Sequence, residues 1–132
     1  MNQSKNKTYL FSKGFEYAGH WHKQANKLTF SLVKFWVKRP VVYALVDNND
    51  QILYIGRTEV DLEKAMNRIK LGPEGQTTNR RLHEQLLKHL EKPLSIEIFA
   101  YTSAKNHTDH AAYFDKFKAD LLQHISSLWN RS

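Results

Sequence analysis

The chain has 132 residues, of which 41% are hydrophobic and 25% are charged, as in one folded domain and unlike a disordered or membrane-spanning chain. It has no cysteine, so disulfides and thiolate metal sites are excluded and a cytoplasmic location is expected. The net charge is +7, and residues 1–40 hold eight Lys or Arg against one acidic residue. This asymmetry favours DNA or RNA as a partner over a membrane, and a solvated lysine-rich surface is the ordinary alternative.

We expect residues 1–40 to form a basic N-terminal extension that carries one strand and packs on a main domain over residues 41–132. The strand is predicted in residues 27–35, where apolar and polar side chains alternate with the two-residue period of a half-buried strand. The residues before it form a polar start. Pro40 ends the segment.

A β-hairpin is predicted from Val41 to Gly56. Its two arms, VVYALV and ILYIG, are rich in β-branched and aromatic residues, and the four residues DNND lie between them. Asn and Asp accept left-handed backbone angles and bond their own backbone, so they favour a turn at this place. The hairpin is the most sharply defined element in the sequence.

Three helices and a strand are predicted after the hairpin. Asp61 can cap a first helix whose apolar residues recur at helical spacing, and Gly72 ends it. A second helix with a leucine face extends to Pro93, and residues 94–101 alternate as a strand. A last helix is predicted from about Ala112 to Ser126. The expected fold class is α+β, a small antiparallel sheet with helices around it.

Two tyrosines lie at matching places on the arms of the predicted hairpin, Tyr43 in the triplet VVY and Tyr54 in the triplet YIG. Gly56 is the last residue of the second triplet. This pattern resembles the GIY-YIG nuclease superfamily. The likeness continues through YIGRT and the loop GPEGQTTNRR, and FEYAGHW and LWN near the two ends resemble a small bacterial or phage branch. The resemblance covers nearly the whole chain and implies the GIY-YIG fold.

The resemblance also implies a chemistry, the hydrolysis of a phosphodiester with one divalent metal ion. A tyrosine activates water, an Arg on the helix after YIG stabilises charge on the phosphate, and a Glu on the last helix holds the metal. Tyr43, Tyr54 and Gly56 keep their family positions, but Ala65 stands where the Arg belongs and Lys118 where the Glu belongs. Because an ammonium repels a divalent cation, we expect no cofactor and a degenerate nuclease that binds nucleic acid without cutting it.

Two alternatives stay open. Arg68 and Asp115 each lie one helical turn from a lost position, so they could replace the missing groups, with His83 as a proton carrier, in an enzyme that uses Mg²⁺ or Mn²⁺. The protein could instead be an inhibitor or immunity-type module that binds a related nuclease. A homodimer is also expected to be possible, from the resemblance alone.

Candidate nucleic-acid contacts are basic residues near the expected site and in the extension: Arg57, Arg68, Arg80, Arg81, Lys34, Lys38 and Arg39. Trp21 and Trp36 lie among the lysines and could stack on bases, although a tryptophan between strands is more often in the core. His20 with His22, and His107 with His110, have spacings that zinc accepts, but neither pair has further ligands at familiar spacing.

Overall fold

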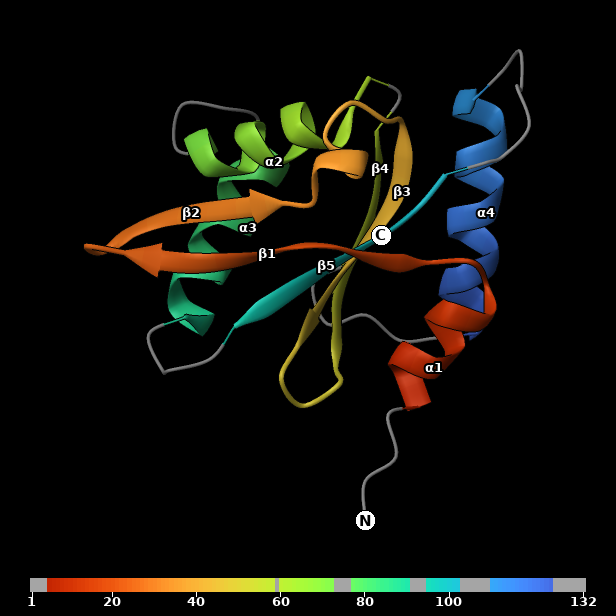
Figure 1. The fold of residues 1–132 in the computed structure, drawn as a ribbon, viewed down its shortest axis with the longest axis horizontal. Helices are drawn as coiled ribbons and strands as arrows, with labels where there is room; N and C mark the ends of the chain where they lie inside the picture. The colour runs from red at the N-terminus through yellow and green to blue at the C-terminus, as the bar shows by residue number, and fades with distance from the viewer. Residues whose placement is uncertain (1–4, 59, 73–76, 91–94, 103–109, 125–132) are drawn as a thin grey trace.

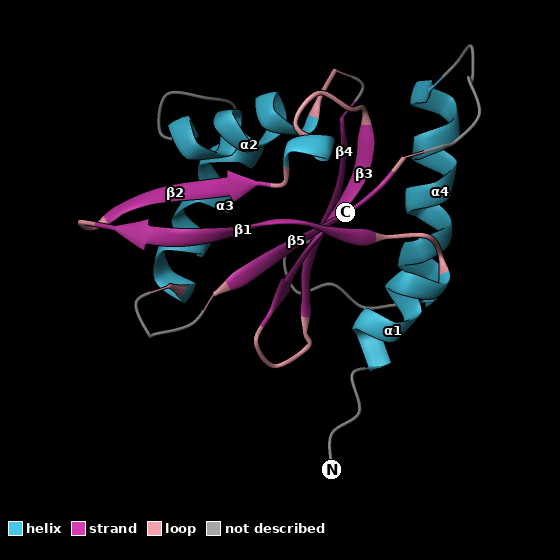
Figure 2. Cartoon of the chain, viewed as in Figure 1, coloured by secondary structure: helices cyan, strands magenta, loops and turns pink. Residues whose placement is uncertain are grey.

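The computed structural model describes residues 5–58, 60–72, 77–90, 95–102 and 110–124 of the chain (Figure 1). In these residues five strands form one sheet with helices around it, which confirms the α+β class (Figure 2). The elements are, in order, α1 (Lys5–Ser12), β1 (Glu16–Gln24), β2 (Lys27–Leu32), the 3-10 helix η1 (Lys34–Trp36), β3 (Val41–Asp47), β4 (Ile52–Thr58), α2 (Leu62–Leu71), α3 (Thr77–His89), β5 (Ile96–Tyr101) and α4 (His110–His124).

The sheet is antiparallel at each of its described pairings and has the strand order β2-β1-β5-β3-β4. Two hairpins, β1 with β2 and β3 with β4, are therefore joined by β5, which lies between β1 and β3. In this order β4 is an edge strand. The YIG residues thus lie at a margin of the sheet, where one side of the strand has no neighbouring strand among the described residues.

The predicted hairpin is confirmed as β3 and β4, and the turn chemistry explains it. Asp47 is buried, and its Oδ1 accepts hydrogen bonds from the backbone N–H groups of Asn49 and Gln51, each at 2.9 Å. Asp50 has a φ of +62°, in the left-handed region that Asp tolerates better than most residues. The side chains of the turn therefore fix the register of the two arms.

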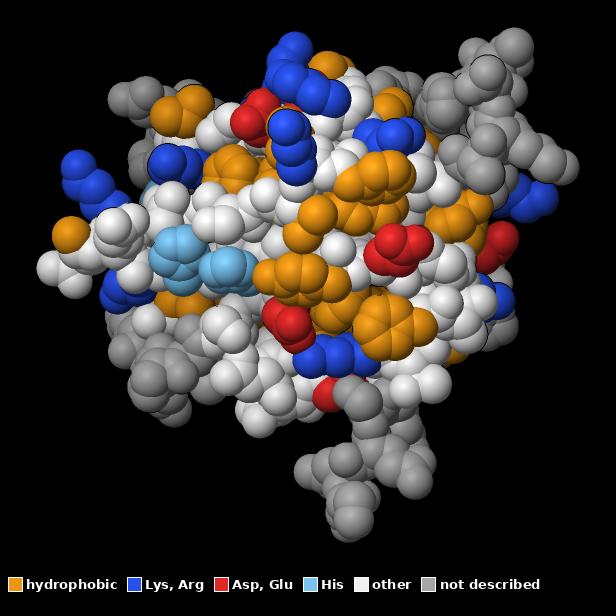
Figure 3. Space-filling view, viewed as in Figure 1, with side chains coloured by type: hydrophobic (Ala, Val, Ile, Leu, Met, Phe, Trp, Pro, Cys, Tyr) orange, Lys and Arg blue, Asp and Glu red, His pale blue; other side chains and the backbone are white. Residues whose placement is uncertain are grey.

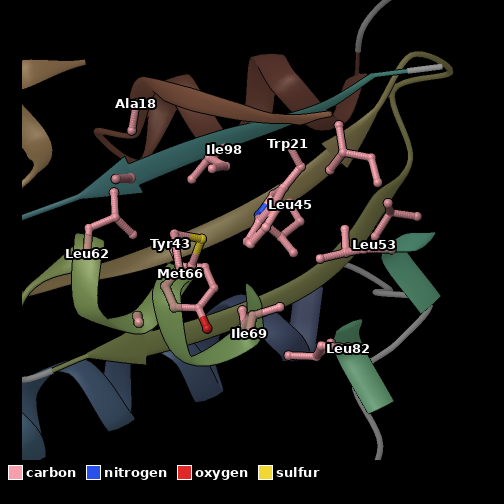
Figure 4. Close-up of a cluster of buried hydrophobic side chains, with 14 of the residues drawn as sticks. Ala18, Trp21, Tyr43, Leu45, Leu53, Leu62, Met66, Ile69, Leu82 and Ile98 are labelled. Carbon is pink, nitrogen blue, oxygen red and sulfur yellow. The ribbon is translucent and has the colours of Figure 1, made fainter. Parts of the chain in front are cut away.

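Two hydrophobic cores lie on the two faces of the sheet. Tyr43 and Leu45 of β3 belong to a core covered by α2 and α3, part of which is drawn in Figure 4. Val42 and Ala44, which alternate with them, belong to a second core that includes residues of α1 and α4. Both faces of β3 are thus buried, as expected for a continuous apolar run in a central strand. Figure 1 shows α2 with α3 at one end of the view and α1 with α4 at the other.

The predicted helices are confirmed with small shifts of their ends. Asp61 Oδ1 accepts the backbone N–H of Lys64 at 2.7 Å, the N-cap expected from the sequence. The apolar face of α3 is buried in the core on the α2 side. The last helix, described from His110 to His124, begins two residues before the predicted start, and the predicted end at Ser126 lies outside the described residues.

The prediction of one strand in residues 1–40 is wrong, because this stretch holds α1, β1 and β2. The period of β1 is hidden by an irregularity between Tyr17 and Gly19, which places Ala18 and Trp21 in the same core although they are three residues apart. Ala25 and Asn26 form the turn to β2 with φ values of +52° and +66°, and Ala is an unusual residue for that region. The predicted strand also ends at Leu32 and not at residue 35.

A helix cap from a distant part of the chain holds α1. The carboxylate of Asp50, in the turn between β3 and β4, accepts the backbone N–H groups of Asn6 at 3.0 Å and Lys7 at 2.9 Å. These are first-turn N–H groups, which have no partner inside a helix. The Lys7 ammonium lies 2.6 Å from Glu97 of β5. Tertiary contacts thus stabilise a short helix whose sequence gives little signal. No helix in the described part of the chain is long and apolar enough to cross a membrane.

Candidate functional site

Three residues of the GIY-YIG pattern lie together on the α2 side of the sheet. Tyr43 is directly opposite Gly56 in the β3–β4 pairing, and the ring centroids of Tyr43 and Tyr54 are 6.1 Å apart. A Cβ added at Gly56 would lie 2.5 Å from Cζ and Oη of Tyr43 and 2.8 Å from Cε2 of Tyr54. The glycine therefore leaves the space that both rings occupy.

Burial makes both phenols weaker acids than a tyrosine in water. Tyr43 is only 5% exposed, and burial first, with the neighbouring Tyr54 second, raises the pKa of Tyr43 far above its ordinary value. Burial also raises the pKa of the half-buried Tyr54, while the charge of Arg81 opposes that rise. A phenol takes a proton from water only after losing its own, so neither tyrosine is set to act as a base near neutral pH.

The position of the expected Arg on α2 is apolar. Ala65 is buried in the same core as Tyr43, so this part of the helix brings no charged donor to the tyrosine. Figure 4 shows Met66 and Ile69 of the same helix near the Tyr43 ring. Arg68, the candidate substitute, is exposed to solvent.

The candidates on α3 differ in position. Arg80 is exposed, whereas Arg81 is half-buried and close enough to Tyr54 for its charge to act on that phenol. His83 ties α3 to α2, because its Nδ1 donates to the Ile69 carbonyl at 2.9 Å, and a Cβ at Gly72 would lie 2.4 Å from the His83 Cβ. His83 therefore contacts the end of α2, a structural role that the spacing of residues does not reveal.

A charged cluster of Arg57, Asp115 and Lys118 lies on the other face of the sheet from the two tyrosines. Arg57 pairs in register with Val42, a residue of the core on the α4 side, and its guanidinium ion-pairs with Asp115 of α4. Nε of Arg57 lies 2.5 Å from Oδ1 of Asp115, and Nη2 lies 3.4 Å from Oδ2. Lys118 is half-buried beside this pair. Burial and the charge of Arg57 lower the pKa of Lys118, and the charge of Asp115 partly opposes them.

The tyrosine pair and the charged cluster therefore lie on opposite faces of the edge strand β4. A ligand that touches both Tyr54 and Lys118 must pass around the outer edge of this strand. From the sequence, all these residues were expected near one site. Side chains alternate between the two faces of a strand, and Tyr54 and Arg57 are an odd number of residues apart in β4. This spacing could have predicted that the two side chains lie on opposite faces.

The charged cluster does not fit a divalent metal ion. Lys118 and Arg57 are both cationic, and the carboxylate beside them already pairs with Arg57. No group of three His, Asp or Glu side chains that could hold a metal occurs among the described residues. His20 and His22 have ring centroids 5.0 Å apart, and Nδ1 of His20 lies 3.0 Å from the Tyr17 hydroxyl. The pair His107 and His110 lies outside the described side chains.

The three candidate basic residues of the N-terminal region lie between β2 and β3, in a segment that holds η1 and is bonded to α2. The N–H groups of Leu62 and Glu63 donate to the carbonyls of Arg39 at 3.1 Å and Val37 at 3.2 Å. Lys34, Lys38 and Arg39 are exposed on this segment, and Lys38 lies 3.3 Å from Glu63. The Arg39 guanidinium lies over the ring of the exposed Phe35, 4.0 Å from its centroid, a contact that was not predicted from the sequence.

The tryptophans do not offer the stacking surface considered from the sequence. Trp21 and Trp36 are 0% and 4% exposed and belong to the core on the α2 side. Exposed aromatic area comes instead from Phe11, Tyr17 and Phe35. Figure 3 shows hydrophobic side chains across the middle of one face, histidine side chains next to them, and Lys and Arg side chains around the group.

Solved structures share this fold, and two of them are nucleases. A mutant of bacteriophage T4 EndoII has a TM-score of 0.73 at 16% sequence identity, and the match covers 95% of this chain and 98% of that chain. The restriction endonuclease HPY188I in complex with product DNA has a TM-score of 0.60 at 17% identity, covering 89% and 80%. No protein-family model and no curated protein sequence matches the chain. The likeness establishes a nuclease-like fold, the fold class predicted from the sequence.

Proposed function

We propose that this protein is a cytoplasmic, nucleic-acid-binding member of the GIY-YIG nuclease superfamily that has lost nuclease activity. The observation that carries the proposal is the cationic cluster of Arg57 and Lys118, at the place where the resemblance implies a metal-binding Glu. The buried Ala65 supports it, because a methyl group replaces the implied guanidinium. Tyr43, Tyr54 and Gly56 keep their mutual packing, as expected for a fold retained without its chemistry.

Hydrolysis of a phosphodiester needs an activated water and a counter-charge for the phosphate oxygens in the transition state. Because the pKa values of Tyr43 and Tyr54 are raised, neither phenol is suited to activate a water molecule. The side chains that could supply the counter-charge are Arg81 near Tyr54, and Arg57 and Lys118 on the other face of β4. These cations can bind phosphate oxygens, but binding ground state and transition state equally well accelerates nothing.

Two features support DNA or RNA as the partner. The fold is shared over most of the chain with a restriction endonuclease in complex with product DNA. The segment before β3 presents Lys34, Lys38 and Arg39 to solvent, and α2 binds its backbone at Val37 and Arg39. Because the backbone is already ordered, only the side chains lose conformational entropy when they meet a phosphate chain.

The alternative of an active enzyme with displaced groups has less support. Asp115, the candidate metal ligand, pairs with Arg57 and has Lys118 close by, so a divalent cation there would face two positive charges. Arg68 is exposed, not buried with the tyrosines.

The test is a cleavage assay on plasmid DNA and structured RNA with Mg²⁺ or Mn²⁺, comparing the native protein with the Ala65→Arg, Lys118→Glu double variant. Ala65→Arg, Lys116→Glu is the matched control, since Lys116 is an exposed residue of the same helix and the change of charge is equal. Because Ala65 is buried, the single variant Lys118→Glu is assayed too, and circular dichroism checks each fold. Gel-shift titrations measure nucleic-acid binding in parallel.

The expected result is binding without cleavage by the native protein, with any metal-dependent cleavage confined to the variants that carry Lys118→Glu. Metal-dependent cleavage by the native protein would overturn the loss of activity, and Asp115→Ala would then show whether the displaced group is responsible. If the native protein neither cleaves nor binds any of these nucleic acids, the proposal is wrong and a protein partner, such as a related nuclease, is the better hypothesis.

A further inference from the structure

Lys118 is a half-buried cation without an ion-pair partner among the described residues. The carboxylate nearest in the cluster, that of Asp115, is bound to the Arg57 guanidinium through both of its oxygens. A partly desolvated ammonium beside a guanidinium is unfavourable unless an anion neutralises it. Lys118 therefore brings a positive charge that no carboxylate of the described residues pairs with, at the place where cationic side chains from β4 and α4 converge.

Asp115 gives the cluster a defined geometry. Its carboxylate holds Arg57, whose side chain is 30% exposed, so the guanidinium is oriented before any ligand arrives. Lys118 lies one turn further along α4 than Asp115 and brings a point charge to the same place. The Lys118 ammonium can donate to the oxygens of one phosphate group, and the guanidinium, whose Nε and Nη2 bind Asp115, adds its positive charge to that place.

We propose that Arg57 and Lys118 form a metal-independent binding site for one backbone phosphate of DNA or RNA. The inference rests on the proposed function. It adds the place at which the nucleic acid is held and states that no metal ion is needed there. The ammonium supplies by itself a positive charge that a bound metal would otherwise bring. The site adjoins the edge of β4 that has no neighbouring strand among the described residues, so a polynucleotide backbone can pass along this edge with one phosphate on the Arg57–Lys118 pair.

The experiment measures fluorescence anisotropy of a labelled DNA duplex and a labelled RNA hairpin, in EDTA and in Mg²⁺, over a series of salt concentrations. The variants are Lys118→Ala, Lys118→Arg and the control Lys116→Ala, which removes an exposed charge from the same helix. An excess of inorganic phosphate tests whether the site prefers a free anion. Since Lys118 has no ion pair to lose within the described residues, Lys118→Ala is expected to fold, which thermal unfolding checks.

We expect the native protein to bind equally well in EDTA and in Mg²⁺. Lys118→Ala should bind about tenfold more weakly, with a salt slope smaller by about one, while Lys116→Ala stays within about twofold and Lys118→Arg retains most of the affinity. Equal losses for Lys118→Ala and Lys116→Ala, a need for Mg²⁺, or displacement by millimolar phosphate alone would each overturn the site while leaving nucleic-acid binding intact. Absence of binding by the native protein would overturn the proposed function and the site together.

Discussion

Gly56→Ala should destabilise the protein through one added carbon atom. The new Cβ would lie 2.5 Å from two atoms of Tyr43 and 2.8 Å from Tyr54, about 1 Å inside ordinary van der Waals contact. Tyr43 is 5% exposed and packed under α2, so its ring has little room to move away. Overpacking of this kind costs about 2 to 3 kcal/mol, near the upper end of measured cases. In a domain of this size that is a fall of roughly 6 to 12 °C in Tm.

The assay is urea unfolding followed by circular dichroism, arranged as a double-mutant cycle with Tyr43→Leu. The leucine lacks the ring atoms that the new Cβ would meet, so Gly56→Ala should cost at least ~1 kcal/mol less in that background. Leu121→Ala, in the core on the α4 side, is the control background and should be additive with Gly56→Ala. A Gly56→Ala variant within about 0.5 kcal/mol of the native protein would refute the reasoning, because surface substitutions have effects of that size.

Two further predictions concern Tyr43 and Asp50. The folded state holds the Tyr43 proton more tightly than the unfolded chain does, so this contribution to stability is complete below the ordinary pKa of 10.0 and is lost as the pH rises above it. Tyr43→Phe should therefore flatten the fall of Tm between about pH 9.5 and 11.5, and parallel curves for the two proteins would contradict this. Asp50→Ala removes the acceptor for two N–H groups of α1 and should cost about 1 to 2 kcal/mol. Hydrogen exchange should then accelerate in α1 and not in β5; uniform acceleration would show that Asp50 does not act through the cap.

The sequence predicts best where a local rule and the tertiary structure agree. The apolar arms around DNND define the β3–β4 hairpin, and Asp61 caps α2 as its position suggests. β1 escapes prediction because the irregularity near Gly19 breaks its period. α1 escapes because the Asp50 carboxylate that caps its first turn comes from a residue more than forty positions away.

The candidate site shows the same limit. The residue types at Tyr43, Tyr54, Ala65 and Lys118 can be read from the chain, and so can the expectation that the ammonium of Lys118 repels a metal. Their distribution over two faces of β4 depends on the packing of α4, which leaves no local mark. The burial that raises the pKa of Tyr43 likewise comes from α2 and could not be known from the strand alone.

The central position of β5 has a consequence for how the chain assembles during synthesis. Both hairpins can form early, since each joins neighbouring segments, but neither can be linked to the other until Ile96–Tyr101 is available to both. Until then β1 and β3 each present an open backbone edge of the kind that invites pairing with another chain. A nascent chain that pauses before β5 would therefore be a natural client for a chaperone, and a product truncated there would aggregate and not fold into a smaller domain.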